Sequence, residues 1–413
     1  MPRYRDHHLH LPFIRLDSSK RPTLKFLYGV RVARDLVNKL ALFFMPIYLF
    51  QFGQTSGVYA FTGLSHFHQG IIALGTYYVL YGLIALSTAI PLAQLIRKVG
   101  HQKVMILSYL LRLIGLLLLY ASNIHPLFIF AAVVFEALQS NLFWPSYYTV
   151  LSQNTFKNHM GKDLGILQFL LQLVAVVSPA ISGLVAATIG LESIFLIALV
   201  GTMIGLIFTL FMEIESIKDT VSLKEFMSWL TEVRFRKLTV SIMGRYVNDA
   251  SLYVWPLYVF IFLGSVDKVG YLYTISLFIA MIFTYFISVY IDHTKSRKPF
   301  FLSGGVLTIL WLARTQVLSI VSIALIDVVD RLTSNFHWLF YDMVLIRRSK
   351  GSNALSYFVY REMILNATAM LFWTVFMGFF VFDYGWNSLF LFAAVGVGLS
   401  LLVKDKEKIY VEK

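Results

Sequence analysis

Two stretches of the sequence carry the same series of acid, hydroxyl, amide and aromatic side chains. In each, the acid, hydroxyl, Trp and Tyr follow at steps that place them on one face of a helix. A carboxyl group can pair with a cation or take up a proton, and an aromatic ring offers apolar contact with a polar handle. These faces could therefore line a cavity for a small molecule. The residues are Glu136, Ser140, Asn141, Trp144 and Tyr147, matched by Asp330, Ser334, Asn335, Trp338 and Tyr341.

The elements that must position these side chains are membrane-spanning helices. Of 413 residues, 58% are hydrophobic and only 14% are charged, whereas a soluble protein has about 25% charged residues. The apolar runs have the length of a spanning helix, about 20 residues. An all-α integral membrane protein is therefore predicted, with twelve spans near 27–52, 71–95, 104–121, 126–151, 164–187, 191–213, 238–263, 269–291, 299–317, 319–346, 354–380 and 386–403.

The basic residues outside these spans indicate the orientation. If both termini are cytoplasmic, nearly all Lys and Arg residues of the tails and loops lie inside, with Lys268 and Arg314 as exceptions. This bias follows the positive-inside rule and accounts for the net charge of +13 without nucleic acid. We expect a plasma (inner) membrane protein with a basic tail (1–26), two six-helix bundles (27–213 and 238–403), a cytoplasmic linker (214–237) and a C-terminal tail (404–413).

Some chemistries are excluded by what the sequence lacks. It has no Cys, hence no disulfide, iron–sulfur cluster or thiolate zinc site, and it has no P-loop for a nucleotide. The first 25 residues lack the apolar core of a cleavable signal peptide. His7, His8 and His10 there are interpreted as part of a solvated tail rather than as metal ligands.

The linker contains the pattern of a short amphipathic helix. The run from Ser222 to Glu225 has the form of a capping box. Leu223, Phe226, Met227 and Leu230 then follow at helical spacing on one face. We expect this helix to lie on the inner leaflet and to tether the two halves.

The two halves of the chain are repeats. Three patterns recur in the same order, on spans one and seven, four and ten, and six and twelve. In the first, Asn38, Pro46 and Tyr48 match Asn248, Pro256 and Tyr258; the second is the acidic and aromatic series above; in the third, Gly190, Ser193 and Phe195 match Gly385, Ser388 and Phe390. Both halves begin inside and have six spans, so a parallel 6+6 arrangement is expected.

At this point the sequence resembles the major facilitator superfamily. The loops 93–103 (AQLIRKVGHQK) and 288–298 (SVYIDHTKSRK) are similar to its signature between spans two and three, with Arg97 and Lys295 at positions where the family has Asp and Gly. The resemblance implies a cytoplasmic gate formed by Gly100, Lys103, Asp292, Arg297 and Lys298. Residues 178–183 (SPAISG) are similar to an element of family antiporters, which favours efflux.

Charged and amide residues also lie at membrane depth. Each charge costs at least about 2.5–3.5 kcal/mol at the bilayer centre, so these groups should face a cavity or each other. Pairs spaced i,i+4, namely Arg31/Asp35, Asp35/Lys39 and Arg245/Asp249, could simply neutralise one another. The Trp and Tyr residues of the two stripes could likewise lie in interfacial belts. The further cavity candidates are Asp35, Asn38, Gln168, Gln172, Arg245, Asn248, Asp249, Arg361, Glu362 and Asn366.

These features predict a secondary active transporter of a small organic solute that works by rocking of two halves. Glu136 and Asp330 are the expected proton-coupling acids, and His337 is expected to be a packing residue. Efflux is slightly favoured; uptake of a sugar-like nutrient and lipid flipping are alternatives. A membrane-embedded transferase, with His66 and His68 as the nearest metal-binding pattern, is the alternative from another class. We expect a monomer without cofactor, metal or nucleic acid.

Overall fold

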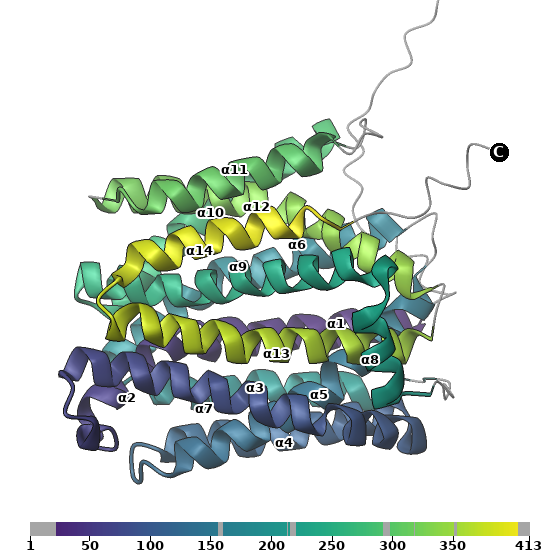
Figure 1. The fold of residues 1–413 in the computed structure, drawn as a ribbon, viewed down its shortest axis with the longest axis horizontal. Coiled ribbons are helices and arrows are strands. Elements are labelled where there is room, and N and C mark those ends of the chain that lie inside the picture. The colour runs from purple at the N-terminus through teal and green to yellow at the C-terminus, as the bar shows by residue number, and fades with distance from the viewer. Residues whose placement is uncertain are drawn as a thin grey trace, which may run out of the picture.

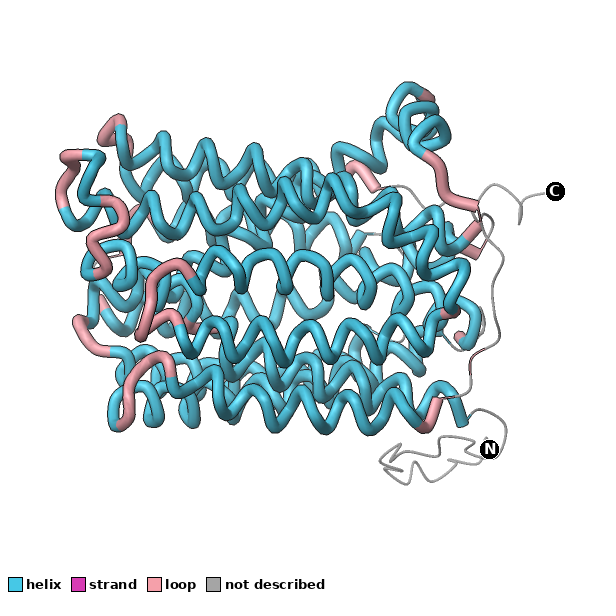
Figure 2. Tube along the Cα trace, turned by 90° about the horizontal axis from the view of Figure 1, so that it is seen from below, coloured by secondary structure: helices cyan, strands magenta, loops and turns pink. Residues whose placement is uncertain are grey.

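The computed structural model describes residues 22–155, 160–212, 214, 220–291, 298–317, 319–350 and 353–403, and every regular element in them is a helix (Figures 1 and 2). The first half contains α1 (Pro22–Val37), η1 (Asn38–Leu42), α2 (Met45–Thr55), η2 (Ala60–Thr62), α3 (His66–Val99), α4 (His101–Ala121), α5 (Phe128–Asn154), α6 (Met160–Thr188) and α7 (Ser193–Leu210). The second contains α8 (Leu223–Thr231), α9 (Val233–Leu263), α10 (Val266–Ile291), α11 (Lys298–Arg314), α12 (Ile320–Ser349), α13 (Ala354–Val381) and α14 (Gly385–Ser400).

The expected spans coincide with these helices. Span one is made of α1, η1 and α2, and α3 to α7 and α9 to α14 form the others in order. Within the described residues, eight helices are long and apolar enough to cross a membrane by themselves. The separation of spans nine and ten is correct as well, because α11 ends at Arg314 and α12 begins at Ile320.

The outer surface of the bundle is apolar. Large hydrophobic side chains on many of the helices are exposed, among them Leu117 on α4, Val200 on α7, Ile275 on α10, Ile309 on α11 and Leu371 on α13. A surface of this kind is unfavourable in water and suited to lipid, and helices satisfy their own backbone hydrogen bonds there. The chain is an all-α integral membrane protein.

The spanning helices run side by side, and α8 crosses their ends on the right of Figure 1. We call this the linker end, and the opposite end, which carries η2, the far end. The most extensive contacts between the two halves run along α3 with α13 and along α6 with α10. Gly183 and Gly270 allow the second contact, since a Cβ atom on Gly270 would lie 2.5 Å from the carbonyl oxygen of Pro179.

Span one is interrupted where its polar residues lie. The π-helical turn η1 begins at Asn38, and the amide of Phe43 donates to the carbonyl of Asn38 at 3.0 Å. The carbonyl of Leu40 accepts from the Ser182 hydroxyl of α6 at 2.7 Å, so a side chain of the SPAISG element supports the irregular turn. Such single turns are frequent at functional sites. In the second half, Pro256 lies inside the continuous helix α9, so the repeats differ here.

The linker helix begins as its sequence indicates, with one difference. The Ser222 hydroxyl accepts from the amide of Glu225 at 3.2 Å. The carboxylate of Glu225 accepts from the Tyr360 hydroxyl of α13 at 2.8 Å, while the amide of Ser222 donates to that same hydroxyl. The expected reciprocal capping box is therefore incomplete, because a tertiary contact takes the carboxylate.

The buried face of α8 is rotated from the expected one. Phe226 and Trp229 are buried and contact the ring of Tyr360 on α13. Leu223 and Met227 are more than half exposed. The helix therefore packs on span eleven through Trp229 rather than through all four apolar residues of the expected face.

Candidate substrate cavity

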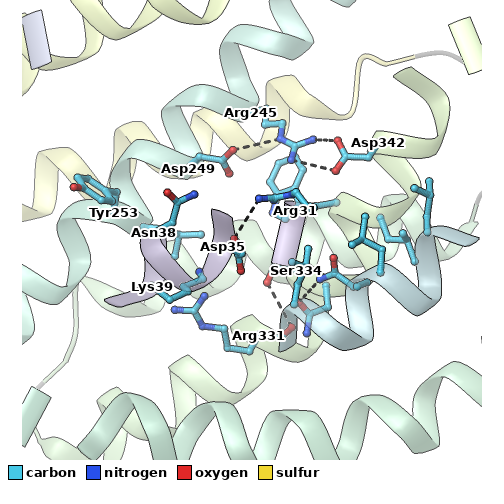
Figure 3. A pocket seen from close by; sticks show the side chains of 18 of the residues that line it. Arg31, Asp35, Asn38, Lys39, Arg245, Asp249, Tyr253, Arg331, Ser334 and Asp342 are labelled. Carbon is cyan, nitrogen blue, oxygen red and sulfur yellow. Dashed lines mark hydrogen bonds and ion pairs between the residues drawn. The ribbon is translucent and has the colours of Figure 1, made fainter. Parts of the chain in front are cut away.

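A cavity of about 500 Å³ lies between α1, α5, α6, α9 and α12, and thus between the two repeats (Figure 3). We call it the central cavity. Its wall combines charged groups and amides with rings and Leu side chains. The polar and aromatic lining residues are Arg31, Asp35, Asn38, Lys39, Phe43, Tyr147, Tyr148, Gln168, Arg245, Asp249, Tyr253, Arg331, Ser334, Asn335, Trp338 and Asp342.

A second space of about 300 Å³ adjoins the central cavity. The two share Asn38, Asp249 and Tyr253 in their walls. We call it the aromatic chamber, because six rings line it in addition to Tyr253. These are Tyr77, Tyr78, Tyr81, Trp144, Tyr246 and Trp373.

Ion pairs hold most of the charges in the central cavity. Arg31 binds Asp35 one turn away at 3.4 Å, and Arg245 binds Asp249 at 3.3 Å, as the i,i+4 spacing suggested. Arg245 also binds Asp342 of α12. Figure 3 shows Arg245 between these two acids. Intrahelical neutralisation therefore explains part of the pattern, and a link from span seven to span ten adds to it.

Glu136 faces the aromatic chamber. Its side chain is buried, and one carboxylate oxygen accepts from the Gln139 amide at 2.9 Å. The Gln139 carbonyl in turn accepts from Arg34 of span one. The other carboxylate oxygen of Glu136 has no hydrogen-bond partner among the described residues. Arg112 of α4 lines the same chamber and donates to Asn38 at 2.7 Å, so groups from spans one, three and four meet around this acid.

Asp330 lies in a different environment from its repeat counterpart. It is buried and binds Arg314 at 2.6 Å, and Arg314 lies 3.8 Å from Asp327. The Trp255 indole donates to Asp327 at 2.8 Å. Asp330 lines none of the cavities described here. Arg314, which was expected among the outer-loop charges, is 1% exposed inside this cluster.

The face of α12 that lines the central cavity is turned from the expected stripe by about one residue. Ser334, Asn335 and Trp338 do line it, but Arg331 and Asp342 take the places expected for Asp330 and Tyr341. Tyr341 is buried beside α9 and accepts from the Ser241 hydroxyl at 3.2 Å. Residues one position apart differ by about 100° around a helix, so sequence spacing alone allowed both stripes.

A match between the sequence and a family model identifies the family of this fold. A family model described as Major Facilitator Superfamily matches residues 30–326, which is more than half of the chain. The chain belongs to the major facilitator superfamily. This bears out the resemblance drawn from the loop sequences. No curated protein matches the chain.

Solved structures of transporters have a similar fold. A POT family transporter in complex with a thioalcohol-conjugated peptide is similar with a TM-score of 0.66 and 14% identity, over 92% of this chain and 94% of that one. A POT family transporter in complex with 5-aminolevulinic acid gives 0.67 and 14%, with the same coverage. A D-xylose–proton symporter gives 0.64 and 15%, over 92% of this chain and 97% of that one. At these identities the likeness shows the fold alone.

Several other residues that the sequence predicted to line a cavity do so in this major facilitator protein. Ser140 and Trp144 line the aromatic chamber, and Tyr147 lines the central cavity. Gln168 lines the central cavity and donates to Asn335 at 3.3 Å. Gln172 reaches a smaller space between α6 and α10.

Other expected residues are engaged elsewhere. Asn141 donates to the carbonyl of Ala85 at 2.6 Å, and Asn248 accepts from the Trp311 indole at 2.9 Å. These amides tie spans four and seven to their neighbours. On span eleven, Arg361 binds Glu362 at 2.8 Å. Arg361, Glu362 and Asn366 line none of the three cavities described here.

The expected gate is only partly within the described residues. Gly100 alone separates α3 from α4, and its φ of 94° is a conformation that favours glycine. Lys103 and Lys298 are exposed at the linker end. Asp292 and Arg297 lie outside the described residues, as do His7, His8 and His10. The gating role of this loop pair stays a prediction.

The histidines singled out from the sequence that the structure describes, His66, His68 and His337, have hydrogen-bond partners near the ends of helices or in the core. His66 contacts the carbonyl of Gln54 at 3.2 Å, and His68 contacts the hydroxyl of Ser65 at 2.7 Å. Among the described residues no group of three His, Asp or Glu could hold a metal ion. His337 is buried between the hydroxyls of Ser303 and Ser400, at 2.9 and 3.2 Å, in the arrangement of a packing residue.

Several candidates were missed by sequence reasoning. Asp342, Arg331 and Tyr148 line the central cavity, and Gln139 and Arg112 line the aromatic chamber. The sequence did contain a signal for Arg331 and Asp342, because positions 331, 335, 338 and 342 also lie on one face of a helix. Arg112 gave a signal too, as a charge inside an apolar run, which is rarely placed toward lipid.

Proposed function

We propose that this chain is a proton-coupled secondary active transporter of a small organic solute, with the central cavity as its binding site and Glu136 as its coupling acid. The observation that carries the proposal is the position of Glu136. It is 5% exposed, faces the aromatic chamber, has one free carboxylate oxygen, and connects through Gln139 to Arg34 on the interrupted span one. A buried carboxyl group in such a place can bind and release a proton as span one moves.

Alternating access by rocking of the halves is the proposed mechanism. Contacts between the halves lie on both sides of the cavities, which such a motion requires. Toward the far end, the Tyr78 and Tyr253 hydroxyls are 2.5 Å apart, and the rings of Phe43 and Tyr273 are 4.7 Å apart. At the linker end, Lys350 of α12 donates to the carbonyl of Thr155, which follows α5. We infer that one set opens while the other closes.

The proposed direction is export. The support is the SPAISG element of span five, which is similar to the antiporter element of the family. Ser182 of this element holds the interrupted turn of span one, and Gly183 packs against Gly270 of span eight. The element therefore contacts both the interrupted span of its own half and span eight of the other half. Uptake remains the second candidate, because a D-xylose–proton symporter has a similar fold.

A transport assay tests the function and its direction. The purified protein is reconstituted into liposomes that contain a pH-sensitive dye, and a panel of amino acids, peptides, sugars, organic acids and organic cations is added. We expect solutes of one class to move protons in vesicles that contain the protein and not in empty vesicles. For export, solute should accumulate on the side from which protons leave. Equal solute transport with and without a pH gradient would contradict proton coupling.

The proposed orientation gives a labelling prediction. The linker end should face the cytoplasm, because the exposed basic residues Arg97, Lys98, Lys103 and Lys298 lie there. In this Cys-free chain, Asn123→Cys in the far-end loop between α4 and α5 should react with an impermeant maleimide on intact cells. Thr220→Cys, just before α8, should react only after permeabilisation. Both side chains are exposed, so the side of the membrane on which each lies determines whether the maleimide reacts with it. Labelling of Thr220→Cys on intact cells would reverse the orientation.

A further inference from the structure

Two basic side chains in the wall of the central cavity form no ion pair with its acidic side chains. Its wall carries Arg31, Lys39, Arg245 and Arg331 against Asp35, Asp249 and Asp342. Arg31 takes Asp35, and Arg245 takes both other acids. Lys39 and Arg331 therefore have no ion pair among the described residues.

These two cations lie close to each other. Figure 3 shows Lys39 and Arg331 on the same side of the cavity, one from span one and one from span ten. Their charges repel each other across the boundary between the two halves, although Asp35, which is bound to Arg31, also attracts Lys39. The Arg331 guanidinium lies 5.7 Å from the centre of the Tyr273 ring, and the carboxylate of Asp327, one turn earlier on α12, attracts it without forming an ion pair. Keeping two like charges together away from bulk water is unfavourable unless an anion joins them.

Lys39 and Arg331 lie where the central cavity meets a smaller side crevice. A side crevice of about 180 Å³ runs from the central cavity toward α10, and Lys39 and Arg331 line both spaces. The Gln168 and Asn335 amides line both as well and add hydrogen-bonding groups. The ion pair of Arg31 with Asp35 also lines both spaces, and Gln172 lines the crevice. The rest of the crevice wall is apolar, formed by Leu171, Ala175, Val176, Leu277, Ala280 and Met281.

We propose that this junction binds an organic acid with a single short alkyl chain, its carboxylate between Lys39 and Arg331 and its chain in the side crevice. The proposal rests on the proposed transport function and names its substrate class. A carboxylate suits the site because it can accept charge-assisted hydrogen bonds from both cations at once. The crevice favours one short chain, since about 180 Å³ is well below the about 300–1,000 Å³ of a site for a drug-sized ligand.

Equilibrium binding tests the head-group contact. The purified protein is placed in nanodiscs of zwitterionic lipid, and radiolabelled octanoate binding is measured by scintillation proximity. Lys39→Gln and Arg331→Gln should each weaken binding at least about tenfold, as expected for loss of a hydrogen bond between charged groups. Lys268→Gln, at an exposed lysine of the far end, serves as the matched control and should bind as the wild type does. Octylammonium should not compete.

The alkyl chain gives a second, independent readout. Each CH₂ group buried in the crevice should raise affinity about fourfold from butyrate to octanoate. Ala175→Leu, which narrows the crevice, should weaken octanoate binding while butyrate binding is kept. Because the affinity for one acid is retained, this shift cannot be attributed to misfolding.

Three results would overturn the proposal. They are unchanged octanoate binding in both charge variants, equal competition by octanoate and octylammonium, and displacement of octanoate by phosphatidylglycerol in the nanodisc, which would assign the site to lipid. Binding is measured without a gradient, so it does not depend on transport. If proton movement with another solute persists while octanoate fails to bind, only this inference fails and the proposed function stands.

Discussion

Replacing Arg314 with Leu should destabilise the protein by about 3–5 kcal/mol, the usual cost of removing one partner of a buried ion pair. Arg314 is 1% exposed, and its guanidinium lies 2.6 Å from Asp330 and 4.1 Å from the centre of the Trp311 ring. Without it, Asp327 and Asp330 would be left as two buried carboxylates. Thermal unfolding of the purified protein in detergent should show a large fall in Tm.

Two further variants show whether the charge itself causes the loss. Arg97→Leu removes an exposed arginine at the linker end and should change stability by no more than about 0.5 kcal/mol. In the triple variant Arg314→Met, Asp327→Asn, Asp330→Asn, the whole cluster is neutral, and much of the lost stability should return. A triple variant as unstable as Arg314→Leu would mean that the side-chain packing of Arg314, and not its charge, stabilises this region.

Glu136→Gln should reduce pH-gradient-driven transport strongly and counterflow exchange little. The amide keeps the size of the side chain but cannot bind or release a proton, so solute can still cross while the gradient no longer drives it. Coupling free energies of about 1–3 kcal/mol correspond to changes of about 5- to 150-fold, and we expect a loss within this range. Transport into proteoliposomes, with and without a pH gradient, measures both quantities.

The repeat counterpart of Glu136 provides the comparison. Asp330→Asn should mainly lower Tm, because Asp330 is bound to Arg314 and lines no cavity described here. Asp383→Asn, at an exposed acid of the far end, should alter neither property. If Glu136→Gln retains normal gradient-driven transport, Glu136 is a structural residue. The coupling acid would then be sought first at Asp249, which lines both the central cavity and the aromatic chamber.

The internal repeat shows how far sequence matching can place side chains at the candidate site. On the matched stretches of spans four and ten, Ser140 and Trp144 line the aromatic chamber and Trp338 lines the central cavity, while their role in binding stays a prediction. The same matching placed Asp330 beside them, although it binds Arg314 of span nine. A repeat preserves the helices and their order, whereas the partner of each charge depends on residues that differ between the halves.

The sequence by itself determined the membrane environment, the spanning helices and the presence of polar groups at membrane depth. These properties depend on composition and on local spacing along one chain segment, because each apolar run must form its own hydrogen bonds in lipid. Only the tertiary structure decided that Asp342 and Arg331 line the central cavity and that Asp330 and Tyr341 do not. The rotation of a helix about its axis is fixed by packing against its neighbours, and a turn of about 100° exchanges one residue for the next.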